Sequence, residues 1–295
     1  MGRCHAHTLT KMTLSRILGI TEAQYRKLEE IANKHFKNIK GKIDGVQENI
    51  LKEIILAKPN ELEGISETYK GLAEQFKNKY KNFTNKKKEY DAYELAESLN
   101  INTCPYCNIN STYTVIKNKD EKITRPEFDH FYDKATYPIL SLSFYNLIPS
   151  CHTCNSSLKS SKKFSIKTHL HPYSDNFNDK VKFHLHINDS RFFYNEKGFK
   201  IALKTEDVRA KNNIDSFKLE TLYQNHKDIV LELIQKREIY PDSYIDELAH
   251  NYSGLFKNRE DLLRLITSGY VEDKDLNKRP LSKLIKDISE ELELI

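Results

Sequence analysis

The chain has 295 residues, of which 38% are hydrophobic and 30% charged, with a net charge of +5. This composition excludes a disordered chain and supplies enough apolar residues for a core without disulfides. The apolar runs are far shorter than the roughly 18 residues that a membrane-spanning helix needs, and the small positive charge only weakly favours a polyanionic partner.

The amino terminus has no apolar stretch of the kind that a secretory signal carries, so we expect a protein of the reducing cytoplasm. Structural disulfides are then not expected, and the five cysteines are free for another task. Cys4 lies close to His5 and His7 in the sequence, which makes a weak candidate metal cluster. An unstructured leader is the preferred interpretation of these three residues.

Residues 1–100 are predicted to form a helical region. Thr21 and Gln24 have the spacing of a capping box, and apolar residues at helical intervals then predict a helix that ends near Gly41. The other amphipathic segments of this region predict helices over residues 46–57, 62–80 and 93–99.

Residues 101–180 differ in character, because cysteine pairs and short β-branched or aromatic runs predict a compact module of strands and loops. In residues 181–295, alternating apolar residues from Val181 to Ile187 predict a strand, followed by a hairpin with its turn at residues 195–198. Helical periodicity returns from residue 217 onward. The predicted fold class is α+β and mostly helical, with the last region forming one compact unit with the central module.

Four of the cysteines form two identically spaced pairs, Cys104 with Cys107 and Cys151 with Cys154. Two residues between thiolates allow a tight turn to present both sulfurs to one tetrahedral ion. Two such turns complete a Cys4 shell that leaves no open position for a substrate. The pattern therefore predicts a structural zinc site, in preference to redox-active or merely buried cysteines.

Between and beside these pairs lie Asp129-His130, Asn146 ahead of the second pair, and Asn155 directly after Cys154. This order resembles the HNH (ββα-metal) endonuclease family. The resemblance implies a first strand that ends near His130, a second strand from Asn146 to Ser150, and a helix from about His152 to Lys159. It also implies a central ββα-metal module flanked by the two helical regions.

The family's chemistry assigns a role to each of these residues. Phosphodiester hydrolysis needs an activated water and a cation, and a neutral His130 is the candidate general base. Asp129 points to the other side of the strand and, with Asn155, is expected to hold a catalytic Mg²⁺ or Mn²⁺. By the resemblance, Asn146 supports the His130 segment. Lys159 lies one turn along the expected helix from Asn155 and could contact a phosphate as a point charge.

Taken singly, these residues have ordinary interpretations: an Asp-His pair is usually a surface pair, and an asparagine that opens a helix is usually a cap. Their place beside two zinc turns favours catalysis. His152 is expected to be an exposed spacer within its cysteine pair. His171 could close over the site or only pack a turn.

Within the family, the chain is most similar to the PtuB nuclease subunits of Septu-type antiphage systems, which also occur beside some retrons. The matching segments are residues 104–108, 128–132, 145–147, 149–151 and 171–173. The resemblance extends over about residues 102–235 and departs at Asp133, where that group has a proline. It implies a partner ATPase of the PtuA kind, related to ABC and SMC proteins, and DNA as the favoured substrate.

Two alternatives stay open. The nuclease could cut RNA, including tRNA, because a metal-activated water does not need a 2′-hydroxyl. Alternatively, the zinc module could bind nucleic acid or a partner without cutting, although such a scaffold has no need for Asp129, His130 and Asn155 together.

Overall fold

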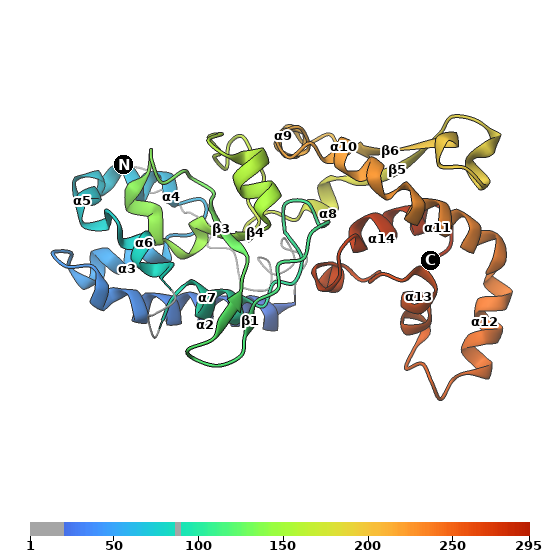
Figure 1. Cartoon of the computed structure of the whole chain (residues 1–295), viewed down its shortest axis with the longest axis horizontal. Helices are drawn as coiled ribbons and strands as arrows, with labels where there is room; N and C mark the ends of the chain where they lie inside the picture. Colours follow the sequence, from blue (N-terminus) through green and yellow to red (C-terminus); the bar gives the residue numbers. More distant parts are fainter. Residues whose placement is uncertain (1–20, 86–89) are drawn as a thin grey trace, which may run out of the picture.

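The computed structural model describes residues 21–85 and 90–295, so the candidate cluster of Cys4, His5 and His7 lies outside the described residues. Figure 1 shows an elongated molecule, with the N-terminal helices at one end and the C-terminal helices at the other. One connected cluster of buried hydrophobic residues extends from Ile31 to Leu294. None of the helices within the described ranges has the length and apolar character that crossing a bilayer requires.

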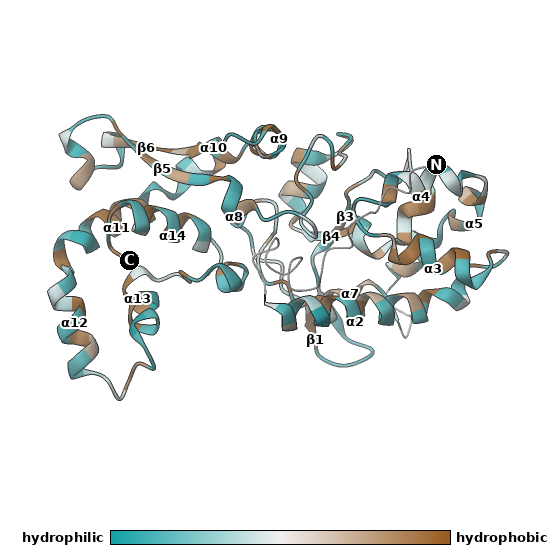
Figure 2. Cartoon of the chain, turned by 180° about the vertical axis from the view of Figure 1, so that it is seen from behind, coloured by the Kyte–Doolittle hydropathy of each residue, from teal (hydrophilic) through white to brown (hydrophobic). Residues whose placement is uncertain are grey.

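The N-terminal region is a layer of helices, as predicted. In the capping box of its first helix, Gln24 N donates to Thr21 Oγ1 at 3.1 Å and Thr21 N donates to Gln24 Oε1 at 2.7 Å. Hydrophobic and hydrophilic residues alternate along this helix (Figure 2), because only one of its faces is buried. The helices are α2 (Glu22–Ile39), α3 (Glu48–Leu56), α4 (Leu62–Thr68), α5 (Ala73–Phe76), α6 (Lys79–Phe83) and α7 (Ala92–Leu99).

The prediction of a single helix over residues 62–80 is wrong, because the structure divides this segment into α4, α5 and α6. Asn78 adopts the left-handed conformation with φ 58°, and an α-helix does not continue through such a residue. The apolar residues keep their helical spacing across these breaks because each short helix buries side chains of its own, Leu62 and Phe76 among them.

The central module contains the predicted strand, strand and helix in that order. Strand β3 (Glu127–His130) pairs antiparallel with β4 (Leu147–Ser150), and η5 (Thr153–Lys159) follows directly. Two details differ from the prediction: Asn146 precedes the second strand, and η5 is a π-helix, in which Ser160 N donates to Asn155 O at 2.9 Å. A separate strand pair is β1 (Val115–Ile116) with β2 (Lys122–Thr124).

The predicted hairpin is present as the antiparallel pair β5 (Lys182–Ile187) and β6 (Phe199–Lys204). Its connection is longer than the predicted turn at residues 195–198, because two short 3-10 helices, η6 (Ser190–Phe193) and η7 (Glu196–Gly198), lie between the strands. The other short 3-10 helices are η1 (Lys40–Lys42), η2 (Lys70–Leu72), η3 (Pro138–Leu142), η4 (Phe144–Asn146), η8 (Gln224–His226) and η9 (Asp273–Lys278).

The C-terminal region is helical, as predicted, and its last helix covers the edge of the hairpin. Phe183 N donates to Asp287 Oδ2 at 2.9 Å and Leu185 N donates to Glu291 Oε2 at 2.8 Å, so helix carboxylates satisfy amides of the edge strand. The short helix α8 (Phe177–Lys180) ends the central module. The helices of the C-terminal region are α9 (Val208–Ser216), α10 (Leu219–Tyr223), α11 (Lys227–Ile239), α12 (Asp242–Asn251), α13 (Arg259–Thr267) and α14 (Ser282–Glu291).

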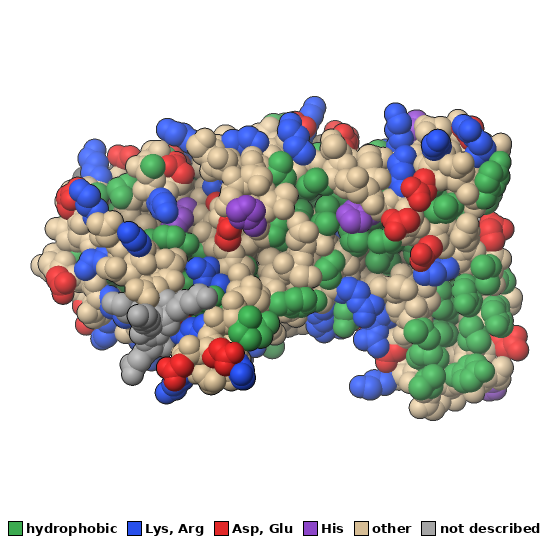
Figure 3. All heavy atoms as spheres, viewed as in Figure 1, with side chains coloured by type: hydrophobic (Ala, Val, Ile, Leu, Met, Phe, Trp, Pro, Cys, Tyr) green, Lys and Arg blue, Asp and Glu red, His purple; other side chains and the backbone are tan. Residues whose placement is uncertain are grey.

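Hydrophobic side chains gather on the surface over α12 and α13 (Figure 3). Ile239, Tyr244, Tyr252, Leu255 and Leu265 are exposed large hydrophobic residues in and next to α12 and α13.

Candidate metal centre and active site

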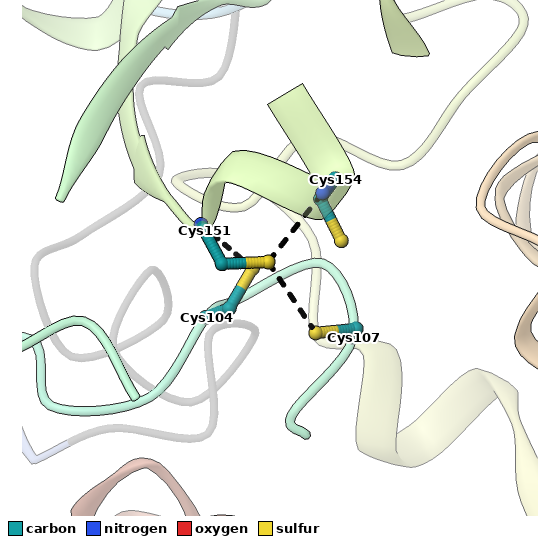
Figure 4. Close-up of side chains that lie close together, drawn as sticks. All are labelled: Cys104, Cys107, Cys151 and Cys154. Atoms are coloured by element: carbon teal, nitrogen blue, oxygen red, sulfur yellow. Dashed lines mark hydrogen bonds between the residues drawn. The ribbon is translucent and has the colours of Figure 1, made fainter. Parts of the chain in front are cut away.

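The four paired cysteines come together where the loop after α7 meets the end of β4 and the start of η5 (Figure 4). All four are buried, and their sulfurs lie within 4.8 Å of one another. The Sγ atoms of Cys107 and Cys151 are 4.0 Å apart, which is about twice a disulfide bond length. A tetrahedral zinc with Zn–S bonds of about 2.3 Å spaces its sulfurs by about 3.8 Å. The predicted cluster is confirmed, and it could hold a zinc ion.

The surroundings of the sulfurs also fit a metal. Ile109 N donates to Cys107 Sγ, while Asn110 Nδ2 and Cys154 N donate to Cys151 Sγ, each at 3.4 Å. Such bonds stabilise metal-bound thiolates. Burial raises the pKa of the Cys104 thiol. Four thiolates packed together in a buried place need a cation to compensate their charge. Because the four cysteines fill a tetrahedral shell, the ion would be structural.

The C-terminal region holds the first cysteine turn in place. The buried hydroxyl of Tyr223 in α10 donates to Cys107 O at 2.6 Å. Leu281 N donates to Asn108 O at 2.6 Å, and Lys283 N donates to Asn108 Oδ1 at 3.1 Å. Residues far away in the sequence therefore fix the loop that presents Cys107.

Strand β3 separates its neighbouring side chains onto two faces, as expected for extended backbone. Glu127 and Asp129 face η5, since their carboxylates bond to side chains of that helix. His130 lies on the opposite face, with its ring centroid 4.4 Å from that of Tyr80 in the N-terminal region. The prediction that Asp129 and His130 serve different sides of the strand agrees with this arrangement.

Asp129 is enclosed by two partners. Lys159 Nζ donates to its Oδ1 at 2.9 Å, and the Tyr106 hydroxyl donates to its Oδ2 at 2.6 Å. Asp129 is only 3% exposed and Lys159 1%. Burial raises the pKa of the Asp129 carboxyl, and the charge of Lys159 and the Tyr106 hydrogen bond oppose that rise.

Lys159 does not lie where a phosphate could reach it, contrary to the sequence-based expectation. Its ammonium group is buried, and in addition to Asp129 it donates to His130 O at 2.7 Å. The helical spacing placed Lys159 one turn beyond Asn155, but it gave no sign that the side chain turns inward to neutralise a buried carboxylate.

Asn155 contacts Glu127 instead of Asp129. Its Nδ2 donates to Glu127 Oε2 at 2.8 Å, which leaves its Oδ1 oxygen directed away from that carboxylate. The structure therefore does not join the two expected ligands of the catalytic cation in one contact. It does place both where β3 packs against η5, because Asn155 belongs to η5 and Asp129 bonds to Lys159 of the same helix.

His130 has the hydrogen bond that selects a tautomer suited to a general base. Its Nε2 lies 3.0 Å from Ser141 O, and a carbonyl only accepts, so Nε2 carries the proton and Nδ1 keeps its lone pair. Burial lowers the pKa of His130 to about 4. The imidazole is thus neutral near pH 7, which is the form that can take a proton from water.

Asn146 makes the contacts that a supporting role requires. Its Oδ1 accepts from Tyr132 N at 2.8 Å, and its Nδ2 donates to Tyr132 O at 3.0 Å and to Leu140 O at 3.1 Å. These bonds fix the backbone just beyond His130 to η3, which contains Leu140 and Ser141. The side chain is completely buried.

His171 and His152, the other two histidines considered near the site, have different surroundings. His171 is buried, packs its ring 4.2 Å from that of Phe131, and accepts from Tyr173 N at 3.1 Å, so it packs a turn. His152 is exposed, as expected of a spacer, but its Nδ1 is 2.7 Å from Glu127 Oε1.

Sequence reasoning missed Glu127 and Tyr106. Glu127 lies two residues before Asp129 in the same strand, so the alternation that separated Asp129 from His130 also places Glu127 on the Asp129 face. Tyr106 stands between two cysteines and gave no signal of its bond to a carboxylate that follows 23 residues later.

Comparisons with known proteins give one distant relation. No family model matches the chain, and no solved structure matches it. Septu protein PtuB from Bacillus thuringiensis is 30% identical to it over 137 residues. The similarity is to a Septu protein. It covers 46% of this chain and 43% of PtuB, so the aligned segment spans less than half of that relative's length.

Proposed function

We propose that this chain is a metal-dependent HNH endonuclease that hydrolyses phosphodiester bonds in nucleic acid, with DNA as the favoured substrate. The observation that carries the proposal is the order β3, β4 and η5, in which Asp129-His130 ends the first strand. One cysteine pair precedes this unit and the other lies at the junction of β4 and η5. The partial similarity to a Septu PtuB protein supports the same family.

In this proposal His130 is the general base. The bond from its Nε2 to Ser141 O holds the ring, and Nδ1 accepts the proton of the attacking water. Asp129 and Asn155 would hold a Mg²⁺ or Mn²⁺ ion, which supplies positive charge for the developing negative charge on the phosphate. In the structure Lys159 neutralises Asp129. A cation that binds this carboxylate would therefore have to compete with the ammonium group of Lys159 in a buried ion pair.

The test is a cleavage assay on supercoiled plasmid and on total tRNA, with Mg²⁺ or Mn²⁺ and then with EDTA. We expect metal-dependent cutting by the wild-type chain and none by His130→Ala. Cutting of plasmid alone supports a DNA nuclease, and cutting of tRNA alone would assign RNA as the substrate. Equal inactivity of wild type and variant, in the presence of the partner ATPase, would reject the proposal.

We further propose that the nuclease is the effector of a cytoplasmic antiphage complex with a PtuA-like ATPase. The Septu PtuB similarity supports this role. The exposed hydrophobic residues over α12 and α13 are of the kind found at protein contact surfaces. Co-expression with the neighbouring ATPase gene should give one complex on size exclusion. Separate elution of the two chains would reject the partnership.

The rival function is a zinc scaffold that binds nucleic acid or a partner without cutting. The enclosure of Asp129 by Lys159 and Tyr106 favours this rival, because a carboxylate with two buried partners already has a structural role. The scaffold predicts nucleic-acid binding that is equal in wild type and His130→Ala and needs no Mg²⁺. The cleavage assay therefore separates the two functions.

A further inference from the structure

The exposed start of η5 carries a group of polar side chains gathered around one carboxylate. Glu127 Oε1 lies 2.7 Å from His152 Nδ1, while Oε2 accepts from Asn155 Nδ2 and from Ser156 Oγ, each at 2.8 Å. The side chains of His152 and Glu127 are 73% and 37% exposed. This carboxylate is accessible from solvent, unlike that of Asp129 two residues along the same strand.

The separation of Glu127 Oε1 and His152 Nδ1 is close to that of two neighbouring ligands on one ion. With metal bonds of about 2.0 to 2.1 Å, adjacent ligand atoms lie about 2.9 to 3.3 Å apart, depending on the geometry. The observed 2.7 Å would have to open by only a few tenths of an ångström. The His152 side chain is exposed, so a small rotation of its imidazole makes this adjustment without repacking.

The remaining contacts orient the pair. Asn155 and Ser156 together hold Oε2, which leaves Oε1 as the oxygen that faces His152. Hydrogen bonds of this kind fix the orientation of metal-binding carboxylates. His152 lies between Cys151 and Cys154, so the cysteine cluster fixes the backbone that presents its imidazole.

We propose that Glu127 and His152 form the protein half of a second divalent-metal site, distinct from the cysteine cluster and from Asp129. A carboxylate and an imidazole suit Mn²⁺, Co²⁺, Ni²⁺ or Zn²⁺, and the open side of the site leaves positions for water or for phosphate oxygens. The site stands whether or not the chain proves to be a nuclease. If it is one, a cation here adds positive charge on the face of β3 that carries Asp129.

The experiment measures Mn²⁺ binding to the zinc-loaded full chain by electron paramagnetic resonance. Mn²⁺ prefers oxygen and nitrogen ligands and does not displace zinc from thiolates. Pulsed measurements report whether a nitrogen atom coordinates the bound ion. We expect nitrogen coupling in the wild type and its loss in His152→Ala. In Glu127→Gln we expect the affinity for Mn²⁺ to fall by about tenfold or more.

His250→Ala is the matched control, because His250 is also exposed and lies in α12, in a separate part of the fold. Its nitrogen coupling and Mn²⁺ affinity should equal those of the wild type. Unchanged zinc content in every variant excludes loss of folding as the cause.

Nitrogen coupling that persists in His152→Ala, or Mn²⁺ affinity that is equal in Glu127→Gln and wild type, would overturn the site. If Asp129→Asn alone removed Mn²⁺, this inference would fail while the cation proposed for catalysis would stand. Conversely, the second site would survive an inactive cleavage assay, so the two proposals fail separately.

Discussion

Lys159 and Asp129 form an ion pair at 2.9 Å in which both side chains are almost completely buried. Lys159 comes from the last residue of η5 and Asp129 from β3, so the pair joins the helix to the strand on the side away from the N-terminal layer. Each charge would be costly in this environment without the other.

The first prediction concerns the stability of this pair. Lys159→Met keeps an apolar stem of similar length and removes the ammonium group, so Asp129 keeps the Tyr106 hydroxyl but loses its cationic partner. Removing one partner of a buried pair costs about 3 to 5 kcal/mol. We expect a loss of that size in the free energy of unfolding, measured by urea denaturation at pH 7.

The double variant Lys159→Met with Asp129→Asn supplies the control. It leaves no uncompensated charge, so it should be more stable than Lys159→Met alone. If the two variants were equally unstable, the loss would come from packing around Lys159, and the ion pair would have no part in it.

The second prediction separates the catalytic from the structural residues. His130→Ala should abolish cleavage and retain zinc, because His130 is not a member of the cysteine cluster and its Nε2 bonds to Ser141 O. Cys151→Ser should lose zinc and unfold at lower denaturant concentration, since a structural zinc site contributes its binding energy to folding. Zinc content by atomic emission and urea midpoints measure the two effects. Loss of zinc in both variants would contradict the division.

Some of this site could be predicted because its signals are local. The spacing of two residues within each cysteine pair requires only a tight turn, and it correctly placed Cys104 and Cys151 in one cluster. The capping box at Thr21 depends on contacts three residues apart, and it is present as predicted. Strand alternation likewise placed Asp129 and His130 on opposite faces of β3.

The rest depends on contacts between residues that are distant in sequence. Lys159 bonds to a carboxylate 30 residues before it in the sequence. Sequence periodicity does not distinguish a lysine that turns into the core from the solvent-exposed lysine expected at a helix end. The break at Asn78 escaped prediction because the apolar residues on either side keep the helical interval. Packing of the whole chain decides both features, and single-sequence patterns do not carry that information.

The third prediction tests the contact between α10 and the cysteine cluster. Tyr223→Phe removes the hydroxyl that donates to Cys107 O at 2.6 Å and leaves this buried carbonyl without that donor. We expect the free energy of unfolding to fall by about 1 to 3 kcal/mol. Zinc transfer to a chelator should also be faster, because the bond fixes the first cysteine turn. Tyr113→Phe, at an exposed tyrosine, should change neither quantity, and an equal effect of the two variants would contradict the proposed link.

The fourth prediction concerns acid stability. His35 lies fully buried between Tyr90 and Leu142, with Nδ1 2.9 Å from the tyrosine hydroxyl and Nε2 2.9 Å from the carbonyl oxygen. Burial lowers the pKa of His35 to about 4, whereas an unfolded histidine has a pKa of about 6.5. Burial also lowers the pKa of His171, to about 3.

Between pH 6.5 and 4 the unfolded chain therefore binds more protons at these histidines than the folded chain does. By linkage, stability is complete above about pH 6.5 and is lost as the pH falls through this window. For His35 alone the loss by pH 4 amounts to about 3 kcal/mol, from 1.36 kcal/mol for each pKa unit.

The measurement is the free energy of unfolding at several pH values between 7 and 4.5, for wild type and His35→Gln. Acid also releases zinc from thiolates, so the wild-type slope contains both effects, and the difference between the two chains isolates that of His35. We expect a shallower slope in His35→Gln and an unchanged slope in the exposed-histidine variant His250→Gln. Parallel slopes in wild type and His35→Gln would show that His35 takes up its proton without unfolding, contrary to its burial in the core.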